Sequence, residues 1–254
     1  MAKTISILLQ KGGSAKTSTS LCFCAFAGKR KRKILLIDMD SQANATFASG
    51  IEDFNYSVRD VLLGKCDVKQ AIQKCKYYDM LPANIDVRDL AGELTDIYAL
   101  KKALEPIQGD YDYIVIDNPP MINAITINSL VASDTMIIPI EPKPFSFMGM
   151  SDLLDTINEI HSLHWNDNLS VLGILLTRYN TRTKLNERME ELIKENAERL
   201  NTTLFDCSIR ECTVIPVCQE KQIALPDYKP SKNNAAMDYN GFVTKALQRL
   251  ESEK

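Results

Sequence analysis

Short runs of apolar residues recur along the chain, and within most of them polar and apolar positions do not alternate. Runs of this kind are typical of strands in a parallel sheet that helices cover on both faces. Longer stretches repeat apolar side chains every three or four residues, as amphipathic helices do. The predicted strands are residues 4–9, 33–38, 113–117, 135–140 and 171–177, and the clearest amphipathic helices are residues 150–160, 185–200 and 239–250.

Strands and helices alternate through most of the sequence. This order predicts a doubly wound α/β fold, in which helices flank both faces of a mostly parallel sheet. Residues 52–110 are the least regular part, with short helices expected around 58–63 and 69–75. Because no internal repeat or long linker divides the chain, we expect residues 1–254 to form a single domain, with no N-terminal helix-turn-helix domain.

The composition narrows the class of protein. A formal net charge of −3 means that any binding to nucleic acid would have to come from a local basic patch. The densest cluster is KRKRK at 29–33, but charge runs are usually solvated turns, and this one should face away from the carboxyl ends of the strands. The seven cysteines form no C-x-x-C pair, and no run has the length of a signal peptide or a membrane span, so we expect a cytoplasmic protein.

Residues 8–20, LLQKGGSAKTSTS, have the position of a phosphate-binding loop. They follow the first predicted strand and lead into an almost wholly apolar helix at 21–28, so backbone amides and a helix N-terminus would face a bound anion together. The usual pattern G-x-x-x-x-G-K-[ST] is not met, because Gln10 and Ala15 replace its glycines and Lys11 is additional. A chance cluster in a surface turn is the simpler alternative, and a dinucleotide site would need G-x-G-x-x-G, which the loop lacks.

Three carboxylates support a nucleotide site. In such a loop Lys16 would contact the β and γ phosphates of a triphosphate, and the Thr17 hydroxyl would bind Mg²⁺. Asp38 ends the second predicted strand and Asp40 follows two residues later, while Asp117 ends the third. Carboxyl ends of parallel strands share one edge, where ligands of open α/β sheets bind. Acidic groups beside phosphates need a metal ion between them, so a magnesium nucleotide is predicted there.

Residues 11–17, KGGSAKT, match K-G-G-x-x-K-[ST] in full. On this loop the chain resembles the ParA-type DNA-partition ATPases of the ParA/Soj/MinD superfamily, P-loop NTPases whose loop is called a deviant Walker A motif. The likeness extends, in order, over nearly the whole chain. It includes the stretches DMDSQANAT, LPANIDV, YDYIVIDNPP, TINSLVASD, TRYNTRTKL, SIREC and DYKPSKNNAAMDY.

The resemblance implies an ATPase that uses ATP and Mg²⁺, turns over slowly alone and forms a homodimer when ATP is bound. Lys11 would reach the phosphates of the partner subunit, Lys16 would hold those of its own, and Asp40 would orient the attacking water. The residues implied around the metal are Thr17, Asp38 and Asp117, and those around the nucleotide are Lys11, Gly12, Gly13, Ser14, Ala15, Lys16, Thr17, Ser18 and, at the adenine, Asn180.

The resemblance also implies DNA binding. In the family the ATP-bound dimer binds double-stranded DNA without reading its sequence, and a ParB-like centromere-binding protein stimulates hydrolysis and release. The chain would then be associated with the nucleoid when ATP is bound. Arg182 and Arg210 match positions that contribute to DNA binding. Thr213 stands where many relatives have a second basic residue, and Ser41 replaces the usual proline, so the DNA patch and the segment after Asp40 are expected to differ from the family pattern.

Two other classes share this fold. A membrane-associated positioning ATPase of the MinD kind carries an amphipathic C-terminal helix that inserts into lipid. Here the helix at 239–250 has a stripe suited to core packing, and the acidic ESEK after it would be repelled by anionic lipid. An iron–sulfur carrier of the nitrogenase-reductase type needs cysteines after the strand that ends at Asp117, and residues 118–206 contain none. DNA partition is therefore favoured, with no membrane partner.

Overall fold

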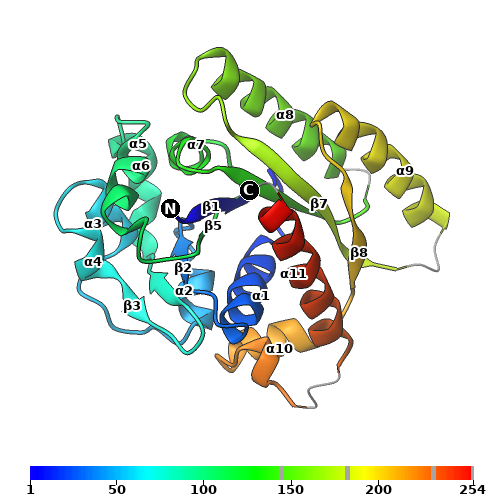
Figure 1. Cartoon of the computed structure of the whole chain (residues 1–254), viewed down its shortest axis with the longest axis horizontal. Helices are drawn as coiled ribbons and strands as arrows, with labels where there is room; N and C mark the ends of the chain where they lie inside the picture. The colour runs from blue at the N-terminus through cyan, green and yellow to red at the C-terminus, as the bar shows by residue number, and fades with distance from the viewer. Residues whose placement is uncertain (144–145, 181–183, 230–232, 253–254) are drawn as a thin grey trace.

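The computed structural model describes residues 1–143, 146–180, 184–229 and 233–252. Within these residues eight strands form one sheet in the order β3-β4-β2-β5-β1-β6-β7-β8 (Figure 1). Neighbouring strands are parallel, except that β3 and β4 are antiparallel. The predicted doubly wound α/β fold is therefore confirmed. The strands are β1 (Lys3–Ile7), β2 (Ile34–Asp38), β3 (Gln73–Lys74), β4 (Asp79–Leu81), β5 (Tyr113–Asp117), β6 (Thr135–Ile140), β7 (Ser170–Tyr179) and β8 (Leu204–Arg210).

All five predicted strands are present, with small shifts at their ends. Leu8 and Leu9 were expected to close the first strand, but they lie beyond the end of β1 and are fully buried. Strands β3, β4 and β8 were not predicted. β8 lies at the edge of the sheet and mixes buried and exposed positions, while β3 and β4 have only two and three residues. Short and edge strands need no continuous apolar run, so no pattern marked them.

Helices cover both faces of the sheet (Figure 1). On one face α1 and α11 lie side by side and pack Phe23 and Phe242 against Ile5 and Leu36 of the strands. On the other face α3 to α7 cover the β2–β5 half, and α8 and α9 cover the β6–β7 half. The α-helices are α1 (Lys16–Lys29), α2 (Asn44–Ala48), α3 (Val58–Leu62), α4 (Val68–Ala71), α5 (Leu90–Glu93), α6 (Ala99–Leu104), α7 (Ala124–Val131), α8 (Ser146–Ser162), α9 (Lys184–Arg199), α10 (Val214–Glu220) and α11 (Asn234–Ser252), and 3₁₀ turns lie at Ile85–Asp89, Glu105–Ile107 and Leu225–Asp227.

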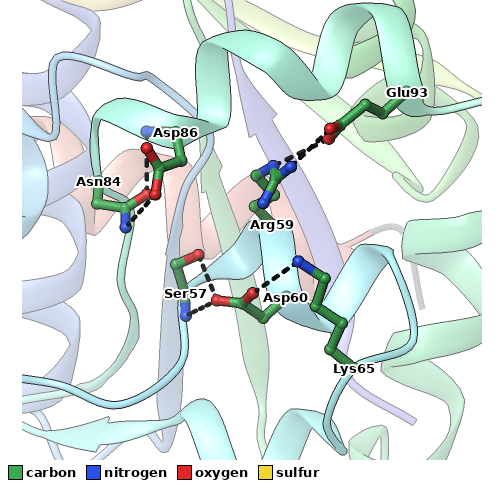
Figure 2. A network of polar contacts seen from close by, with 7 residues as sticks. All are labelled: Ser57, Arg59, Asp60, Lys65, Asn84, Asp86 and Glu93. Carbon is green, nitrogen blue, oxygen red and sulfur yellow. Dashed lines mark hydrogen bonds and ion pairs between the residues drawn. The ribbon is translucent and has the colours of Figure 1, made fainter.

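Local polar contacts hold the irregular segment between β2 and β5 (Figure 2). α3 begins with a capping box, in which the backbone amide and the hydroxyl of Ser57 each donate to Asp60 Oδ2 at 3.0 Å. Arg59 donates two hydrogen bonds to Glu93, at 2.9 and 2.6 Å, and this bidentate pair ties α3 to α5. The helix expected over 69–75 ends early, because its last residues form β3.

The basic run at 29–33 lies between α1 and β2, at the edge away from the strands' carboxyl ends, as predicted. Its arginines are not free in solvent, however. Arg30 donates to the Asn240 side chain at 2.8 Å, and Arg32 forms an ion pair with Glu251. Both partners belong to α11. The run therefore fastens the end of α1 to α11, and only its lysines at 31 and 33 match the expected solvated turn.

Side chains of α11 cover the outer edge of β8. The backbone groups of Leu204 and Asp206 point away from β7, because alternate residues of a strand face opposite sides and residue 203 bonds to β7. Arg249 donates to the Leu204 carbonyl at 2.8 Å, and Lys245 donates to the Asp206 carbonyl at 2.9 Å. Charged side chains thus occupy groups that could otherwise accept another strand.

Candidate nucleotide site

The loop between β1 and α1 contains the predicted phosphate-binding residues. It turns sharply, since the Lys11 amide donates to the Leu9 carbonyl at 2.7 Å, and both Gly13 and Ala15 have left-handed backbones with φ of 74° and 66°. A left-handed alanine costs about 1–2 kcal/mol, which the glycine of the usual motif would avoid. Ala15 directly precedes α1, so the loop amides and the N-terminus of a 14-residue helix meet at one place.

Lys16 lies inside the loop. Its side chain is buried, and its ammonium donates to the Lys11 carbonyl at 2.9 Å. Burial lowers the pKa of Lys16, and the nearby carboxylates of Asp117 and Asp40 oppose that shift. A buried cation is stable only with strong partners, and a phosphate would supply more counter-charge than a loop carbonyl does.

Lys11 is held by its own chain. The side chain is half-buried, and its ammonium donates to Ser146 Oγ at 2.9 Å. Ser146 is buried at the start of α8, which packs tightly on the loop, because a Cβ on Gly149 would come 2.6 Å from the Gln10 carbonyl oxygen. The contact of Lys11 with the phosphates of a partner subunit stays a prediction.

Asp38 and Asp117 are neighbours in the sheet, at the carboxyl ends of β2 and β5, and both are buried. Asp38 accepts hydrogen bonds from the amide and hydroxyl of Thr46 at 2.9 Å each, and from the Asp40 amide at 3.1 Å. Asp117 accepts one from Ser20 Oγ at 2.9 Å. Burial raises the pKa of Asp38 to about 6, and burial together with the charge of Asp38 raises the pKa of Asp117 to about 7.

This acidic pair fits a magnesium ion. One buried oxygen, Asp117 Oδ2, has no hydrogen-bond partner among the residues that the structure describes. A divalent cation would satisfy that oxygen and lower both raised pKa values. Across the described ranges no three His, Cys, Asp or Glu side chains gather into a metal cage. Mg²⁺ is commonly bound by one or two carboxylates together with substrate phosphates, so the donor set suits a magnesium nucleotide.

An open pocket of about 460 Å³ lies over the loop. Residues 12–18 and Asp40 line it, together with side chains from α2, the end of β7 and α10. The structure thus brings the predicted loop residues 12–18 and Asp40 to one pocket, whereas Lys11 is not part of its lining, and Asp38 and Asp117 are buried at the same edge of the sheet.

Other predicted residues lie elsewhere. Asn180, predicted at the adenine, is exposed directly after β7 and is not part of the pocket lining. Arg182 lies outside the described residues. Arg210 is exposed at the end of β8, where its guanidinium makes a bidentate ion pair with Asp238 at 3.0 and 2.7 Å. The roles of Asn180, Arg182 and Arg210 stay predictions.

Several pocket residues were not found from the sequence, among them Phe47 of α2, Arg178 of β7 and Gln219 of α10. Phe47 is 53% exposed, and the Gln219 amide donates to Ser18 Oγ at 3.3 Å. Arg178 stands two positions before Asn180 in TRYNTRTKL, so the right stretch was identified. The backbone conformation at the end of β7 decides which side chain of this stretch faces the loop. No sequence pattern predicts that conformation.

Known proteins are similar to this chain over most of its length. The family model described as an AAA domain matches residues 2–171. The sporulation initiation inhibitor protein Soj of Bacillus subtilis is 36% identical over 219 residues, which cover 83% of this chain and 86% of Soj. The chromosome-partitioning ATPase Soj of Treponema pallidum is 32% identical over 223 residues, 85% of this chain and 83% of that protein. The crystal structure of cobyrinic acid a,c-diamide synthase from Mycobacterium smegmatis with bound ADP and magnesium has a TM-score of 0.85 at 29% identity, covering 100% of this chain and 97% of that one.

The loop, the paired acids and these similarities agree on one class of protein. The chain belongs to the ParA/Soj/MinD superfamily of P-loop ATPases, and it is a magnesium-dependent ATPase. Among the helices that the structure describes, none has the length and apolar character needed to cross a membrane.

Proposed function

We propose that the chain is an ATP-dependent DNA-partition ATPase. It dimerises when ATP is bound, holds double-stranded DNA without reading its sequence, and is stimulated to hydrolyse ATP by a ParB-like centromere-binding protein. The observation that carries the proposal is the loop at 11–17, with its additional lysine, opening into a pocket beside Asp40 and the paired acids Asp38 and Asp117. The 36% identity to Soj supports the same assignment.

ATP and Mg²⁺ are assigned to the pocket over residues 12–18. The loop amides and the N-terminus of α1 donate to phosphate oxygens, and Lys16 exchanges the Lys11 carbonyl for a phosphate. Mg²⁺, when bound, offsets the charge of the phosphates. Thr17 and Asp117 hold it, and the unpartnered Asp117 Oδ2 supports this role. Asp38 supplies the second carboxylate of the acidic pair. Its two hydrogen bonds from Thr46 also fix the segment that carries Asp40.

Hydrolysis is assigned to Asp40 and Lys11. Asp40 is half-buried at the pocket, where a carboxylate can orient an attacking water. Lys11 leaves Ser146 and crosses to the phosphates of the partner subunit, so that cations from both chains stabilise the transition state. Gly12 supports a close approach of the second copy, because the position of a Cβ there is surrounded by open space. Turnover then depends on assembly.

DNA binding is assigned to Arg182 and Arg210. The ion pair of Arg210 with Asp238 lies at the surface, where the arginine side chain is 46% exposed. Exposed ion pairs contribute little to stability and are screened by salt, so a DNA phosphate can compete for this guanidinium. The protein is proposed to act in the cytoplasm and to join the nucleoid while ATP is bound.

The decisive measurement is ATP turnover of the purified protein alone, then with nonspecific double-stranded DNA, then with a small DNA-binding protein encoded beside it as well. We expect slow basal turnover that rises when DNA and the partner are both present. Turnover that responds to neither addition would exclude the partition role while leaving the ATPase assignment intact.

A MinD-like membrane-associated positioning ATPase is the alternative. The structure gives it no support at α11, whose apolar side chains, such as Tyr239, Phe242 and Leu250, are buried in the core. Co-sedimentation with anionic liposomes in the presence of ATP separates the two functions. Protein that stays in the supernatant and shifts DNA fits partition, whereas ATP-dependent pelleting without DNA binding fits the alternative.

A further inference from the structure

Arg178 has an unusual position for a charged residue. It is the last but one residue of β7, and its side chain lines the pocket over residues 12–18. Its φ of 48° lies in the left-handed region, which is unfavourable for any residue with a side chain. Such conformations persist where the surroundings impose them, and they gather at functional sites. Ala15, also left-handed, lines the same pocket.

The guanidinium of Arg178 lies over the loop. Its Nη1 atom is 4.0 Å from the place that a Cβ would occupy on Gly13. Gly13 is inside the turn that bound phosphates would approach, so the absence of a side chain there leaves the space between the arginine and the loop backbone open. A phosphate in the loop would be within reach of both.

The charge of Arg178 is unpaired among the described residues. No described residue makes a hydrogen bond or an ion pair with its guanidinium, whereas Arg210 is paired with Asp238. Lys16 is the other cation of the pocket lining, but it is buried. An exposed and unpaired guanidinium beside a phosphate loop suits an anion with adjacent oxygens, which it can bind in bidentate fashion.

The sheet order places Arg178 and Asp40 on opposite sides of the loop. β1, which leads into the loop, has β5 and then β2 on one side and β6 and then β7 on the other. Asp40 follows β2, and Arg178 ends β7. The arginine therefore approaches the nucleotide from the side away from the residue assigned to the attacking water, and it should act on binding more than on the chemical step.

We infer that Arg178 is a nucleotide-binding residue that acts within its own subunit, its guanidinium contacting phosphate oxygens of the nucleotide held by the loop. The inference rests on the proposed assignment of residues 12–18 to ATP. Its ligand class is a nucleoside di- or triphosphate, because a nucleoside without phosphates offers no anion to the guanidinium.

The test uses Arg178→Gly, Arg178→Lys and Lys16→Ala, with Arg199→Ala as the matched control, since Arg199 is an exposed arginine at the far end of α9. Arg178→Gly removes the guanidinium and relieves the left-handed backbone, so the variant should fold at least as stably as the wild type. We expect its affinity for ATP and ADP to fall about 10- to 100-fold, the effect of losing a charge-assisted hydrogen bond. Adenosine binding, measured by competition, should not change, and Arg178→Lys should recover part of the loss.

The kinetic counterpart is a raised KM with a nearly unchanged kcat. Wild-type ATP affinity in Arg178→Gly, with binding lost in Lys16→Ala, would overturn the inference alone. Unchanged binding in both variants would overturn the assignment of the loop itself. Equal losses for ATP and adenosine, or a loss confined to DNA binding, would also overturn the inference, because the arginine would then serve the base or the DNA.

Discussion

Asp38 and Asp117 show how two buried side chains set the chemistry of this site. Their strands place them side by side, and each carboxylate is costly to ionise without water. Three donors support Asp38, whereas Asp117 accepts from Ser20 and is stabilised further by the Thr17 side chain, and its Oδ2 has no donor among the described residues. Ionising both carboxyl groups without a cation is therefore energetically unfavourable, and metal binding offsets that cost.

Nucleotide-free protein should lose stability as the pH rises through this titration. An unfolded aspartate titrates near its usual pKa of about 4, whereas the folded pKa values are about 6 for Asp38 and about 7 for Asp117. A raised folded pKa means that the fold prefers the protonated form. The stability that the pair contributes is therefore fully present below about pH 4 and is lost as the pH rises to about 7.

Asp117→Asn isolates this effect, because it removes one ionisation at nearly constant shape. Without nucleotide or Mg²⁺, the variant should melt several degrees, about 2–4 °C, above the wild type at alkaline pH, and the difference should shrink toward mildly acidic pH. Differential scanning fluorimetry over a pH series measures it. A variant that melts below the wild type at alkaline pH would contradict the raised pKa.

The residues of the site were predictable where chain order alone decides their place. Lys16 and Thr17 follow from the loop pattern, and Asp38 and Asp117 follow from the rule that parallel strands end at one edge. The contact of Lys11 with Ser146 of the same chain joins residues far apart in sequence, so no local sequence pattern predicts it. The position of Arg178 depends on a single backbone angle, which the sequence does not report.

Among the helices and strands, α1 and the turn that joins β3 to β4 approach each other closely at Gly28. A Cβ on Gly28 would come 1.8 Å from the Tyr77 carbonyl oxygen, so only glycine allows the end of α1 to pack there. The long apolar elements could be predicted from their periodicity. The hairpin of β3 and β4 could not, since its place depends on this backbone contact and on the two- and three-residue length of its strands.

Gly28→Ala should therefore destabilise the protein by about 1–3 kcal/mol or more, the cost of overpacking against backbone. Gly241→Ala is the matched control, because it lies within α11 and nothing surrounds the position of its Cβ. Replacing a helical glycine that is free of contacts should stabilise the protein by about 0.5–1 kcal/mol. Urea denaturation measures the change in the free energy of unfolding for both variants, which should be negative for Gly28→Ala and positive for Gly241→Ala. Equal effects would contradict the close packing.

The whole molecule is proposed to work as a dimer whose formation depends on Lys11. Lys11→Ala should bind ATP but stay monomeric, because the partner's phosphates lose their cation in trans. Asp40→Ala should bind ATP and accumulate as a dimer, because hydrolysis is removed. Light scattering with saturating Mg²⁺ and ATP measures both, and Lys33→Ala, an exposed lysine outside the pocket, should behave as the wild type. Stable dimers of Lys11→Ala would exclude the trans role.

DNA affinity of the ATP-bound protein should fall steeply with salt, since each neutralised phosphate releases counterions and contributes about −0.9 to the slope of log K against log salt concentration. Arg210→Ala should make that slope shallower by about 1 for each phosphate contact that the substitution removes. Fluorescence anisotropy with a random-sequence duplex measures the slope. An unaltered slope would leave Arg210 as the structural partner of Asp238 alone.

The α11 side chains along β8 have a consequence for how copies of this chain can assemble. Arg249 and Lys245 already bond to two backbone carbonyls of β8, so a strand of another copy cannot pair with those carbonyls. At the opposite edge of the sheet, β3 spans only two residues. Extension of the sheet from one copy to the next, as in amyloid, is therefore disfavoured. Contacts between side chains or at the nucleotide face are favoured instead.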